Sequence, residues 1–229
     1  MRRAFAKLRR SILKRIDPKR LVSFGLAELD RKVIPYLKKT PGYFIELGAN
    51  DGVTQSNTFY LEKYKRWRGA LIEAIPQKAE QCKKNRPASL TFTAACVPFD
   101  YNDTHVPVLY SNLMSVAKGL EVPDPERYAD EGKPFLGQSE TIYEFMAPAR
   151  TLTDILLEAN APHIIDFLSL DVEGNEISVL RGVDFERYKF SHMLIEGLTG
   201  PRQLIDFLEP RGYKFVTSLT KQDHLFEST

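Results

Sequence analysis

One segment constrains this chain more than any other: F-I-E-L-G-A-N-D-G at residues 44–52, an apolar run that ends in an acid and a glycine turn. A second apolar run, at residues 70–72, ends in the carboxylate of Glu73. In parallel α/β sheets, two such strands lie side by side and hold an adenosine at their carboxyl ends. The glycines let backbone and ligand approach closely, and the second carboxylate accepts hydrogen bonds from ribose hydroxyls. The pattern predicts an α/β fold with a nucleoside site at this edge.

The composition of the turn separates two kinds of adenosine cofactor. A dinucleotide fingerprint, G-x-G-x-x-G, has a middle glycine beside the pyrophosphate, whereas this chain has Asn50 there. The acids Glu46 and Asp51 repel a pyrophosphate and suit a cofactor that carries an ammonium and a sulfonium. The turn therefore favours S-adenosylmethionine, with Glu73 at its ribose, and methyl transfer as the reaction. A nicotinamide-dependent oxidoreductase is an alternative that this turn disfavours.

Strands and helices alternate along most of the chain. Alternation of this kind predicts a Rossmann-like fold, with a mostly parallel central sheet, helices on both faces and an antiparallel pair of C-terminal strands. We expect one domain at residues 24–229, preceded by an arm at residues 1–23. The alternation is lost at about residues 98–148, where we expect an irregular insertion with two candidate strands, at 106–110 and 141–145. A long insertion inside a compact domain is usually functional. The remaining strands are expected at 43–47, 69–73, 90–97, 164–170, 192–195, 213–217 and 224–226, and helices at 26–37, 54–64, 76–85, 152–159, 176–180 and 204–208.

A second acidic cluster follows the apolar run at residues 164–170. Asp171 and Glu173 come directly after it, and ligands of open α/β sheets bind beyond the carboxyl ends of the strands. Asp171 is the first candidate for a general base and Glu173 the second. The same two carboxylates can instead hold a divalent cation, but a pair at this spacing is a weak metal signal, so we do not expect a metal.

The charge of the chain is divided unevenly. Its net charge is +2, yet residues 1–20 hold nine basic residues and one acid, so this segment carries +8 and the remainder −6. An acidic body argues against a nucleic-acid partner. Only two cysteines are present, Cys82 and Cys96, and they lack zinc spacing, so we expect reduced thiols.

The basic arm has apolar residues at helical spacing, namely Phe5, Leu8, Ile12, Leu13 and Ile16. Three interpretations stay open: peripheral contact of residues 1–20 with an anionic membrane, a removable organellar presequence, or a helix that packs on its own domain. No apolar run reaches the length of a membrane span. We therefore expect a cytoplasmic protein, with the arm as its possible contact to a membrane surface.

Several longer strings occur in a fixed order: G-Y-F-I-E-L-G-A-N-D-G-V-T-Q-S-N-T, W-R-G-A-L-I-E-A, T-L-T-D-I-L, I-D-F-L-S-L-D-V-E-G-N-E-I-S-V-L-R-G, and L-I-E-G with R-G-Y. Together they closely resemble the FkbM-type S-adenosylmethionine-dependent methyltransferases, from Gly42 to the C-terminus. The resemblance implies a Rossmann-like class I methyltransferase fold. It also implies O-methylation, in this family often of sugar hydroxyls in glycans or glycosylated metabolites.

The resemblance also assigns roles to matching residues. It implies that the methionine side of the cofactor is bound by Glu46, Gly48, Asn50 and Gly52, and the ribose by Glu73. Asp171 and Glu173 match the D-x-E-G segment of the family. One departure is Ala74-Ile75 before Pro76, where many relatives have proline directly after the glutamate, and we expect it to shift only a helix start. The insertion matches nothing specific, so the resemblance does not supply the acceptor.

The sequence as a whole predicts an S-adenosylmethionine-dependent O-methyltransferase that acts on a small-molecule or glycan hydroxyl. A catalytically silent membrane-surface module on the same fold is the other alternative. It is weakened by the complete set of acids, which a silent scaffold does not need.

Overall fold

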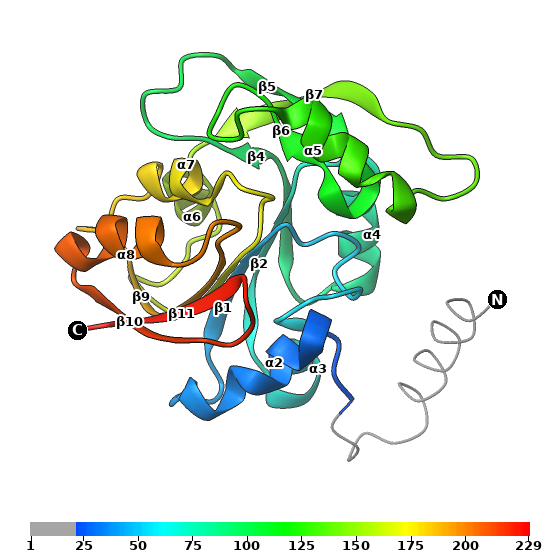
Figure 1. Ribbon diagram of the computed structural model, residues 1–229. Coiled ribbons are helices and arrows are strands. Elements are labelled where there is room, and N and C mark those ends of the chain that lie inside the picture. The colour runs from blue at the N-terminus through cyan, green and yellow to red at the C-terminus, as the bar shows by residue number, and fades with distance from the viewer. Residues whose placement is uncertain (1–21) are drawn as a thin grey trace.

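The computed structural model describes residues 22–229, so the expected arm at residues 1–23 lies outside the described residues except for its last two. Seven strands form the central sheet in the order β10-β11-β9-β8-β1-β2-β3 (Figure 1). Only β11 runs against its neighbours, and this confirms the mostly parallel sheet with an antiparallel C-terminal pair. The strands are β1 (Tyr43–Leu47), β2 (Arg68–Glu73), β3 (Leu90–Thr93), β8 (Ile164–Leu170), β9 (Lys189–Glu196), β10 (Tyr213–Ser218) and β11 (Asp223–Ser228).

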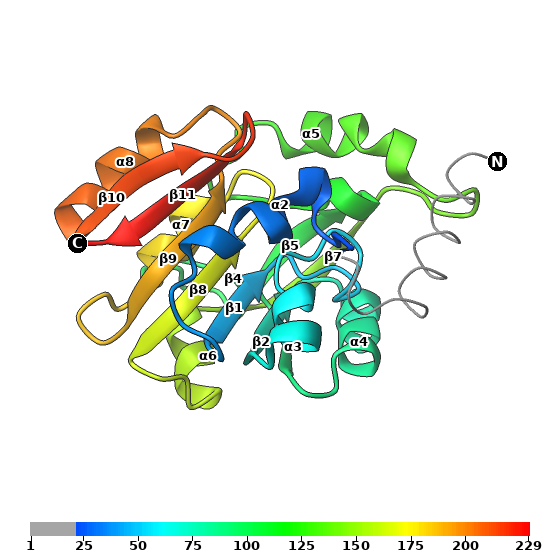
Figure 2. The same cartoon turned by 90° about the horizontal axis from the view of Figure 1, so that it is seen from below.

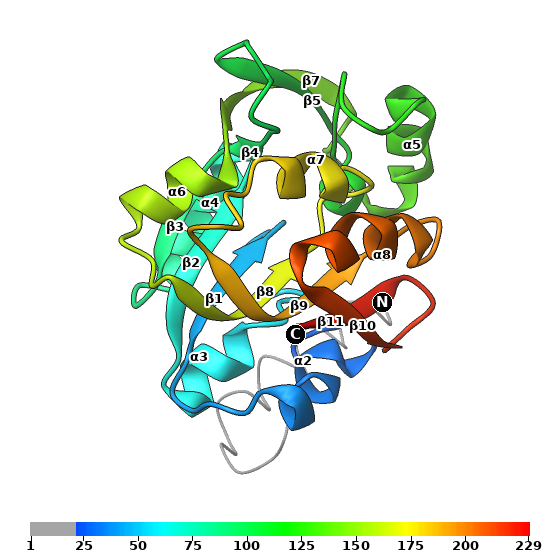
Figure 3. The ribbon, with the colours of Figure 1, turned by 90° about the vertical axis from the view of Figure 1, so that its left-hand side faces the viewer.

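Helices cover both faces of this sheet (Figure 3). One face packs Phe44, Leu71 and Phe167 against α2 (Leu29–Lys32), α3 (Phe59–Lys65) and α4 (Pro76–Asn85). The other face packs Ile45 and Leu168 against α6 (Leu152–Glu158), α7 (Glu176–Arg181) and α8 (Arg202–Leu208). Strands buried on both faces explain why these runs are apolar throughout rather than alternating. Short 3₁₀ turns complete the connections: η1 (Leu26–Glu28), η2 (Ile34–Tyr36), η3 (Asn112–Met114), η4 (Lys133–Phe135) and η5 (Glu209–Arg211).

The insertion contains both candidate strands, as β5 (His105–Tyr110) and most of β7 (Tyr143–Arg150), and further regular elements that we did not expect. These include β6 (Val116–Ala117) and α5 (Pro125–Glu131). With β4 (Ala95–Cys96), its strands form a second sheet in the order β4-β7-β5-β6. The strand expected at 90–97 is therefore divided between the two sheets. Figures 1 and 2 show the insertion as a cap along one edge of the central sheet.

Two expected helices differ from the structure for local reasons. The helix expected at 54–64 begins only at Phe59, because the side chains of Ser56 and Thr58 bind Glu46. The helix expected at 26–37 is broken into short pieces, since Ala27 and Glu28 both have positive φ. By contrast, α6 begins as expected, and the Thr151 hydroxyl accepts the amide of Asp154 as its N-cap at 3.1 Å. Within residues 22–229, no helix combines the length and apolar character needed to cross a bilayer.

Candidate active site

A cavity opens where β1, β2 and β8 end, between the strand ends and the insertion. It holds about 1010 Å³ of empty space, its open mouth included. This is the edge at which open α/β sheets bind their ligands. Strand ends and their loops contribute Gly48, Asn50, Glu73, Asp171 and Glu173 to its walls, and the insertion contributes Val108, Asn112, Leu113, Ser115, Ala117 and Leu120. Five of the expected site residues are thus brought together.

The glycine turn after β1 brings two strand ends into close approach. Gly48 has a φ of +71°, and a Cβ built there would lie 1.8 Å from the carbonyl oxygen of Asp171. No other residue type fits this position without moving the backbone. Asn50 also has a positive φ, of 52°. Its amide donates to Glu73 Oε2 at 2.7 Å, so the turn is tied to the end of β2.

Glu73 lies on the cavity wall and is held in a fixed orientation. Its Oε1 accepts the amide of Ile75 at 2.8 Å, while Oε2 accepts that of Asn50. Each carboxylate oxygen keeps a second lone pair, which is available to a ribose hydroxyl. Burial raises the pKa of the Glu73 carboxyl to about 7, although both amide hydrogen bonds act in the opposite direction. This orientation suits the role expected for Glu73.

Glu46 has a different environment from the one we expected. It does not line the cavity, and its carboxylate accepts the hydroxyls of Ser56 at 2.9 Å and Thr58 at 2.6 Å and the amide of Asn57 at 2.8 Å. The buried guanidinium of Arg86 lies 3.6 Å from it. Glu46 therefore organises the loop at 54–58, part of which lines the cavity.

Asp51 and Gly52 also lie outside the cavity wall. The carboxylate of Asp51 accepts the amides of Val53 at 2.9 Å and Thr54 at 2.6 Å, and these hydrogen bonds lower its pKa against the effect of burial. Gly52 has a φ of +76°, and a Cβ there would lie 2.9 Å from the Arg86 side chain. Both residues shape the turn. Their geometry does not favour the direct contact with a cofactor that we predicted for them.

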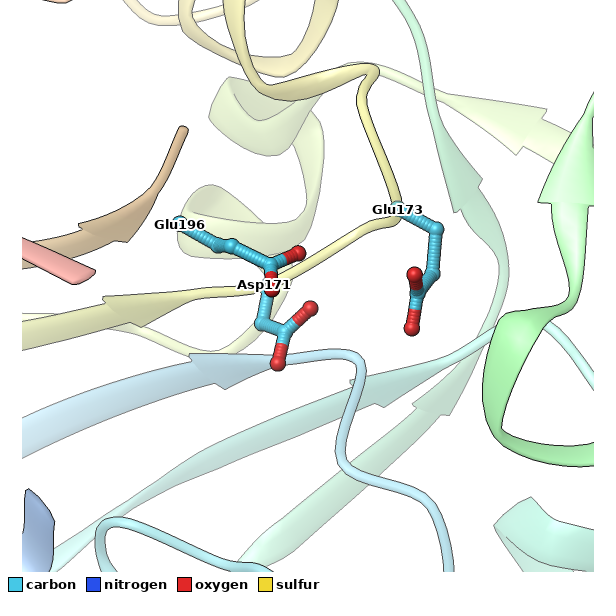
Figure 4. Close-up of side chains that lie close together, drawn as sticks. All are labelled: Asp171, Glu173 and Glu196. Carbon is cyan, nitrogen blue, oxygen red and sulfur yellow. The ribbon is translucent and has the colours of Figure 1, made fainter. Parts of the chain in front are cut away.

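Three carboxylates meet beside the cavity: Asp171 after β8, Glu173 in the loop that follows, and Glu196 at the end of β9. One oxygen of each lies within 4.8 Å of the others. Figure 4 shows Asp171 between the other two. Glu196 was not among the site residues expected from the sequence, although it ends an apolar run as Glu73 does and lies in the L-I-E-G string. The same signal that marked Glu73 marks this residue.

The proximity of these acids changes their proton affinities. Asp171 is open to solvent through the cavity, yet dense surrounding protein raises its pKa to about 6, and a hydrogen bond with Glu196 opposes this shift. Burial and the charges of Asp171 and Glu173 raise the pKa of Glu196 to about 10. Burial and Asp171 raise the pKa of Glu173 well above its ordinary value. The three carboxyls therefore titrate together, and the directions of these shifts favour a protonated Glu196 beside an ionised Asp171 near neutral pH.

The loop that carries Glu173 has a strained backbone, which hydrogen bonds to the side chain of Glu176 hold in place. Glu173 has a φ of 58° and Gly174 one of 92°, both in the left-handed region. The amides of Val172 and Gly174 donate to Glu176 Oε1, each at 3.1 Å. Glu176 thus fixes the loop backbone, beyond the role in the helix dipole that its position at the start of α7 suggests. Strain of this kind is concentrated at functional sites.

The chemistry of the lining residues fits S-adenosylmethionine. Glu73 supplies a carboxylate for the ribose diol, beside the glycine turn at 48–50. Apolar side chains on the same wall, such as Ile72, Ile75 and Val108, suit a purine. Among residues 22–229, Asp171, Glu173 and Glu196 are also the one group spaced closely enough to share a metal ion.

Fold and site together define an α/β protein that binds a nucleoside cofactor at the carboxyl edge of its sheet. Residues 46–215, well over half of the chain, match the methyltransferase FkbM domain. The chain belongs to the FkbM methyltransferase family and is an S-adenosylmethionine-dependent methyltransferase. This confirms the fold, cofactor and enzyme class predicted from the sequence. No curated protein matches the sequence significantly.

Solved structures with a similar arrangement include other methyltransferases. A TehB-like S-adenosylmethionine-dependent methyltransferase from Corynebacterium glutamicum has 9% identity and a TM-score of 0.44, with 99% of this chain and 97% of that one covered. A precorrin-6y C5,15-methyltransferase from Geobacter metallireducens has 13% identity and a TM-score of 0.45, with 91% and 90% covered. A ribosomal protein L11 methylase from Lactobacillus delbrueckii has 9% identity and a TM-score of 0.46, with 93% and 83% covered.

Proposed function

We propose that this enzyme methylates a hydroxyl oxygen of a sugar, in a glycan or a glycosylated metabolite, with Asp171 as the general base. One observation carries the proposal: the carboxyl of Asp171 lines the cavity, and one oxygen each of Asp171, Glu173 and Glu196 lie within 4.8 Å of one another. A hydroxyl acceptor must lose its proton during methyl transfer, and a base with a pKa near 6 is ionised at neutral pH.

Different residues of the chain bind the cofactor and transfer the proton. S-adenosylmethionine supplies, when bound, a methyl group made electrophilic by its sulfonium. Glu73 and the turn at 48–50 hold that cofactor, and Asp171 takes the proton of the acceptor hydroxyl. The hydrogen bond with Glu196 favours the ionised form of Asp171. Alignment of the two reactants accounts for roughly 7–11 kcal/mol of barrier lowering, whereas a base contributes about 10²–10⁴-fold.

The charge of the site supports an uncharged acceptor. Asp171, Glu173 and Glu196 are crowded together, and Glu176 lies close enough to raise the pKa of Glu173 further. An acceptor that carries a phosphate or carboxylate would be repelled in this surrounding. Sugar hydroxyls are neutral and are good hydrogen-bond partners for carboxylates. The polar side chains of Asn112 and Ser115, which the insertion contributes to the cavity, suit the same kind of acceptor.

A transfer assay tests this proposal. Purified enzyme is incubated with methyl-labelled S-adenosylmethionine and neutral glycan, glycolipid, protein and nucleic-acid fractions in parallel. We expect label in a carbohydrate fraction, with mass spectrometry of the released sugar locating an O-methyl group. Asp171→Asn is the control for dependence on the site. Label confined to the protein or nucleic-acid fraction, or an N-methyl product, would overturn the assignment of a sugar hydroxyl.

The proposal also covers where in the cell the enzyme acts. We place the enzyme in the cytoplasm, because Cys82 and Cys96 are both free, buried thiols. Residues 1–20 are proposed to contact an anionic membrane surface, on the basis of their charge of +8. Such contact would concentrate the enzyme near a lipid-linked glycan.

A further inference from the structure

A contact from the insertion reaches the acid cluster. Tyr128 lies on α5, and its hydroxyl donates a short hydrogen bond to Glu173 Oε2. Tyr128 thereby connects an element of the cap to a carboxylate on the cavity wall. No motif in the sequence marks this tyrosine, because the insertion matched nothing specific.

The side chain of Glu173 depends on this contact for its orientation. Its backbone is fixed by the strained loop and by Glu176, but Tyr128 is its one hydrogen-bonding partner among residues 22–229. A glutamate side chain that is free to rotate loses rotamer entropy when it is fixed, so one conformation is favoured only where a contact stabilises it. The hydroxyl of Tyr128 therefore selects one position of the Glu173 carboxylate beside Asp171.

Tyr128 is itself well anchored. The α5 helix begins with Asp124, whose carboxylate accepts the amide of Arg127 at 3.0 Å, and Ser111 donates its hydroxyl to the carbonyl of Ala129 at 2.6 Å. The ring packs against the small apolar cluster of Leu109, Val116 and Ala129. These contacts involve the ring and the helix backbone, so loss of the hydroxyl alone would leave α5 in place.

A second set of contacts docks the same part of the insertion onto the Glu173 loop. The side chain of Asn175 accepts the amide of Glu121 at 3.0 Å and donates to the carbonyl of Ala117 at 3.3 Å. A Cβ at Gly174 would lie 2.9 Å from Val122. Residues 117–128 thus lie directly against the loop, and Ala117 and Leu120 line the cavity.

We propose that Tyr128 is a positioning residue for methyl transfer: its hydroxyl holds the Glu173 carboxylate where that carboxylate binds the acceptor beside Asp171. The proposal rests on the proposed function, and it extends the site to an element outside the known motifs. Tyr128 acts through Glu173 and does not itself contact the reacting atoms.

The test compares Tyr128→Phe, Glu173→Gln and the double variant in the carbohydrate fraction that the wild-type enzyme methylates. We expect Tyr128→Phe to lower kcat by up to about a hundredfold, the cost of a misplaced group near the chemistry, with KM for S-adenosylmethionine unchanged. In the Glu173→Gln background, the same change should have little further effect, because the group that Tyr128 positions is already altered. Tyr101→Phe is the matched control, since that hydroxyl donates to the carbonyl of His105 at 3.0 Å, within the insertion and away from the cavity wall.

Each outcome has one meaning. A kcat for Tyr128→Phe equal to that of wild type, or equal losses in both backgrounds, would overturn the proposal while leaving the proposed function intact. An equal loss in Tyr101→Phe would show a general effect on the insertion and would also overturn it. A wild-type enzyme without activity on any carbohydrate fraction would overturn the proposed function, and this proposal with it. Thermal unfolding of each variant shows that the folded state is retained.

Discussion

The guanidinium of Arg86 is fully buried and lies 3.6 Å from the carboxylate of Glu46. Its Nε also donates to Glu62 at 2.9 Å, and one terminal nitrogen donates to the carbonyl of Gly52 at 3.0 Å. One side chain at the end of α4 therefore holds together the end of β1, the glycine turn and α3. Glu46, which we expected to bind the cofactor, is therefore the acidic partner in this buried ion pair.

Arg86→Met should strongly destabilise the fold. The change leaves the buried Glu46 without its counter-ion, and breaking a buried pair in this way costs about 3–5 kcal/mol. The free energy of unfolding, measured in urea, gives this value directly. Lys83→Met is the matched control on the same helix, because Lys83 and its partner Glu80 are both exposed. A loss below about 1 kcal/mol, the range of surface ion pairs, would contradict the structural role of Arg86.

Glu73→Ala should weaken the binding of S-adenosylmethionine at least about 100-fold. The variant loses two hydrogen bonds from the ribose to a charged acceptor, each worth about 1.5–3 kcal/mol. It also releases the amide of Asn50 and so loosens the glycine turn. Calorimetry measures the affinity, with Glu80→Ala on the exposed face of α4 as control. Wild-type affinity in Glu73→Ala would reject the ribose assignment.

The sequence predicted the positions of Gly48, Glu73 and Asp171 correctly because local signals determine them. An apolar run that ends in an acid or a glycine marks a strand end, and the carboxyl ends of parallel strands meet at one edge. The local pattern does not predict the direction in which each acidic side chain points. Glu46 and Glu73 both end apolar runs, but within the part of the chain that the structure describes Glu46 forms an ion pair, with Arg86, and Glu73 forms none. Local pattern does not reveal that partner.

The insertion was the part least accessible to prediction. Its sheet pairs β4 with β7, so Ala95 lies opposite Ala149, far away in sequence. Pairings of this range depend on the tertiary fold rather than on local propensity. The contact of Tyr128 with Glu173 has the same origin, because α5 and the loop are distant in sequence and meet only in the tertiary fold. The short, proline-punctuated segments of the insertion therefore suggested an irregular chain.

Asp171→Asn should lower kcat at least about a hundredfold while leaving the affinity for S-adenosylmethionine nearly unchanged. The variant keeps the shape of the side chain but removes the proton acceptor. In the wild type, kcat/KM should rise with pH through about 6, because the pKa of Asp171 is raised to about 6 and only the ionised form accepts a proton. A pH–rate profile checks this. Unchanged turnover in Asp171→Asn would move the role of base to Glu173.

Deletion of residues 1–20 should separate membrane contact from chemistry. The arm carries +8 and the remainder −6, so the truncated enzyme should keep its affinity for S-adenosylmethionine and its activity on a soluble acceptor. Sedimentation with anionic liposomes should fall on truncation, and that of the full-length enzyme should weaken steeply as salt rises, since salt screens the attraction. Neutral liposomes are the control. Equal sedimentation of both proteins would reject the membrane role.

Glu196→Gln tests whether a proton or a cation lies among the three carboxylates. Because the pKa of Glu196 is raised to about 10, this residue is a neutral hydrogen-bond donor to Asp171 at pH 7, and a glutamine amide donates in the same way. We therefore expect Glu196→Gln to keep kcat within about tenfold of wild type, and Glu196→Ala to lose more, since one hydrogen bond to a charged group contributes about 1.5–3 kcal/mol.

The same assay after dialysis against a chelator completes the test. If a shared proton is what the carboxylates hold, chelation should leave the wild-type rate unchanged, and Glu196→Gln should remove any decline of the rate near pH 10, because glutamine has no proton to lose in that range. Loss of activity that magnesium restores, together with a Glu196→Gln variant as inactive as Glu196→Ala, would show that a cation binds there instead. In that case Asp171, Glu173 and Glu196 would be its ligands, and the metal would acidify the acceptor hydroxyl that Asp171 is otherwise proposed to deprotonate unaided.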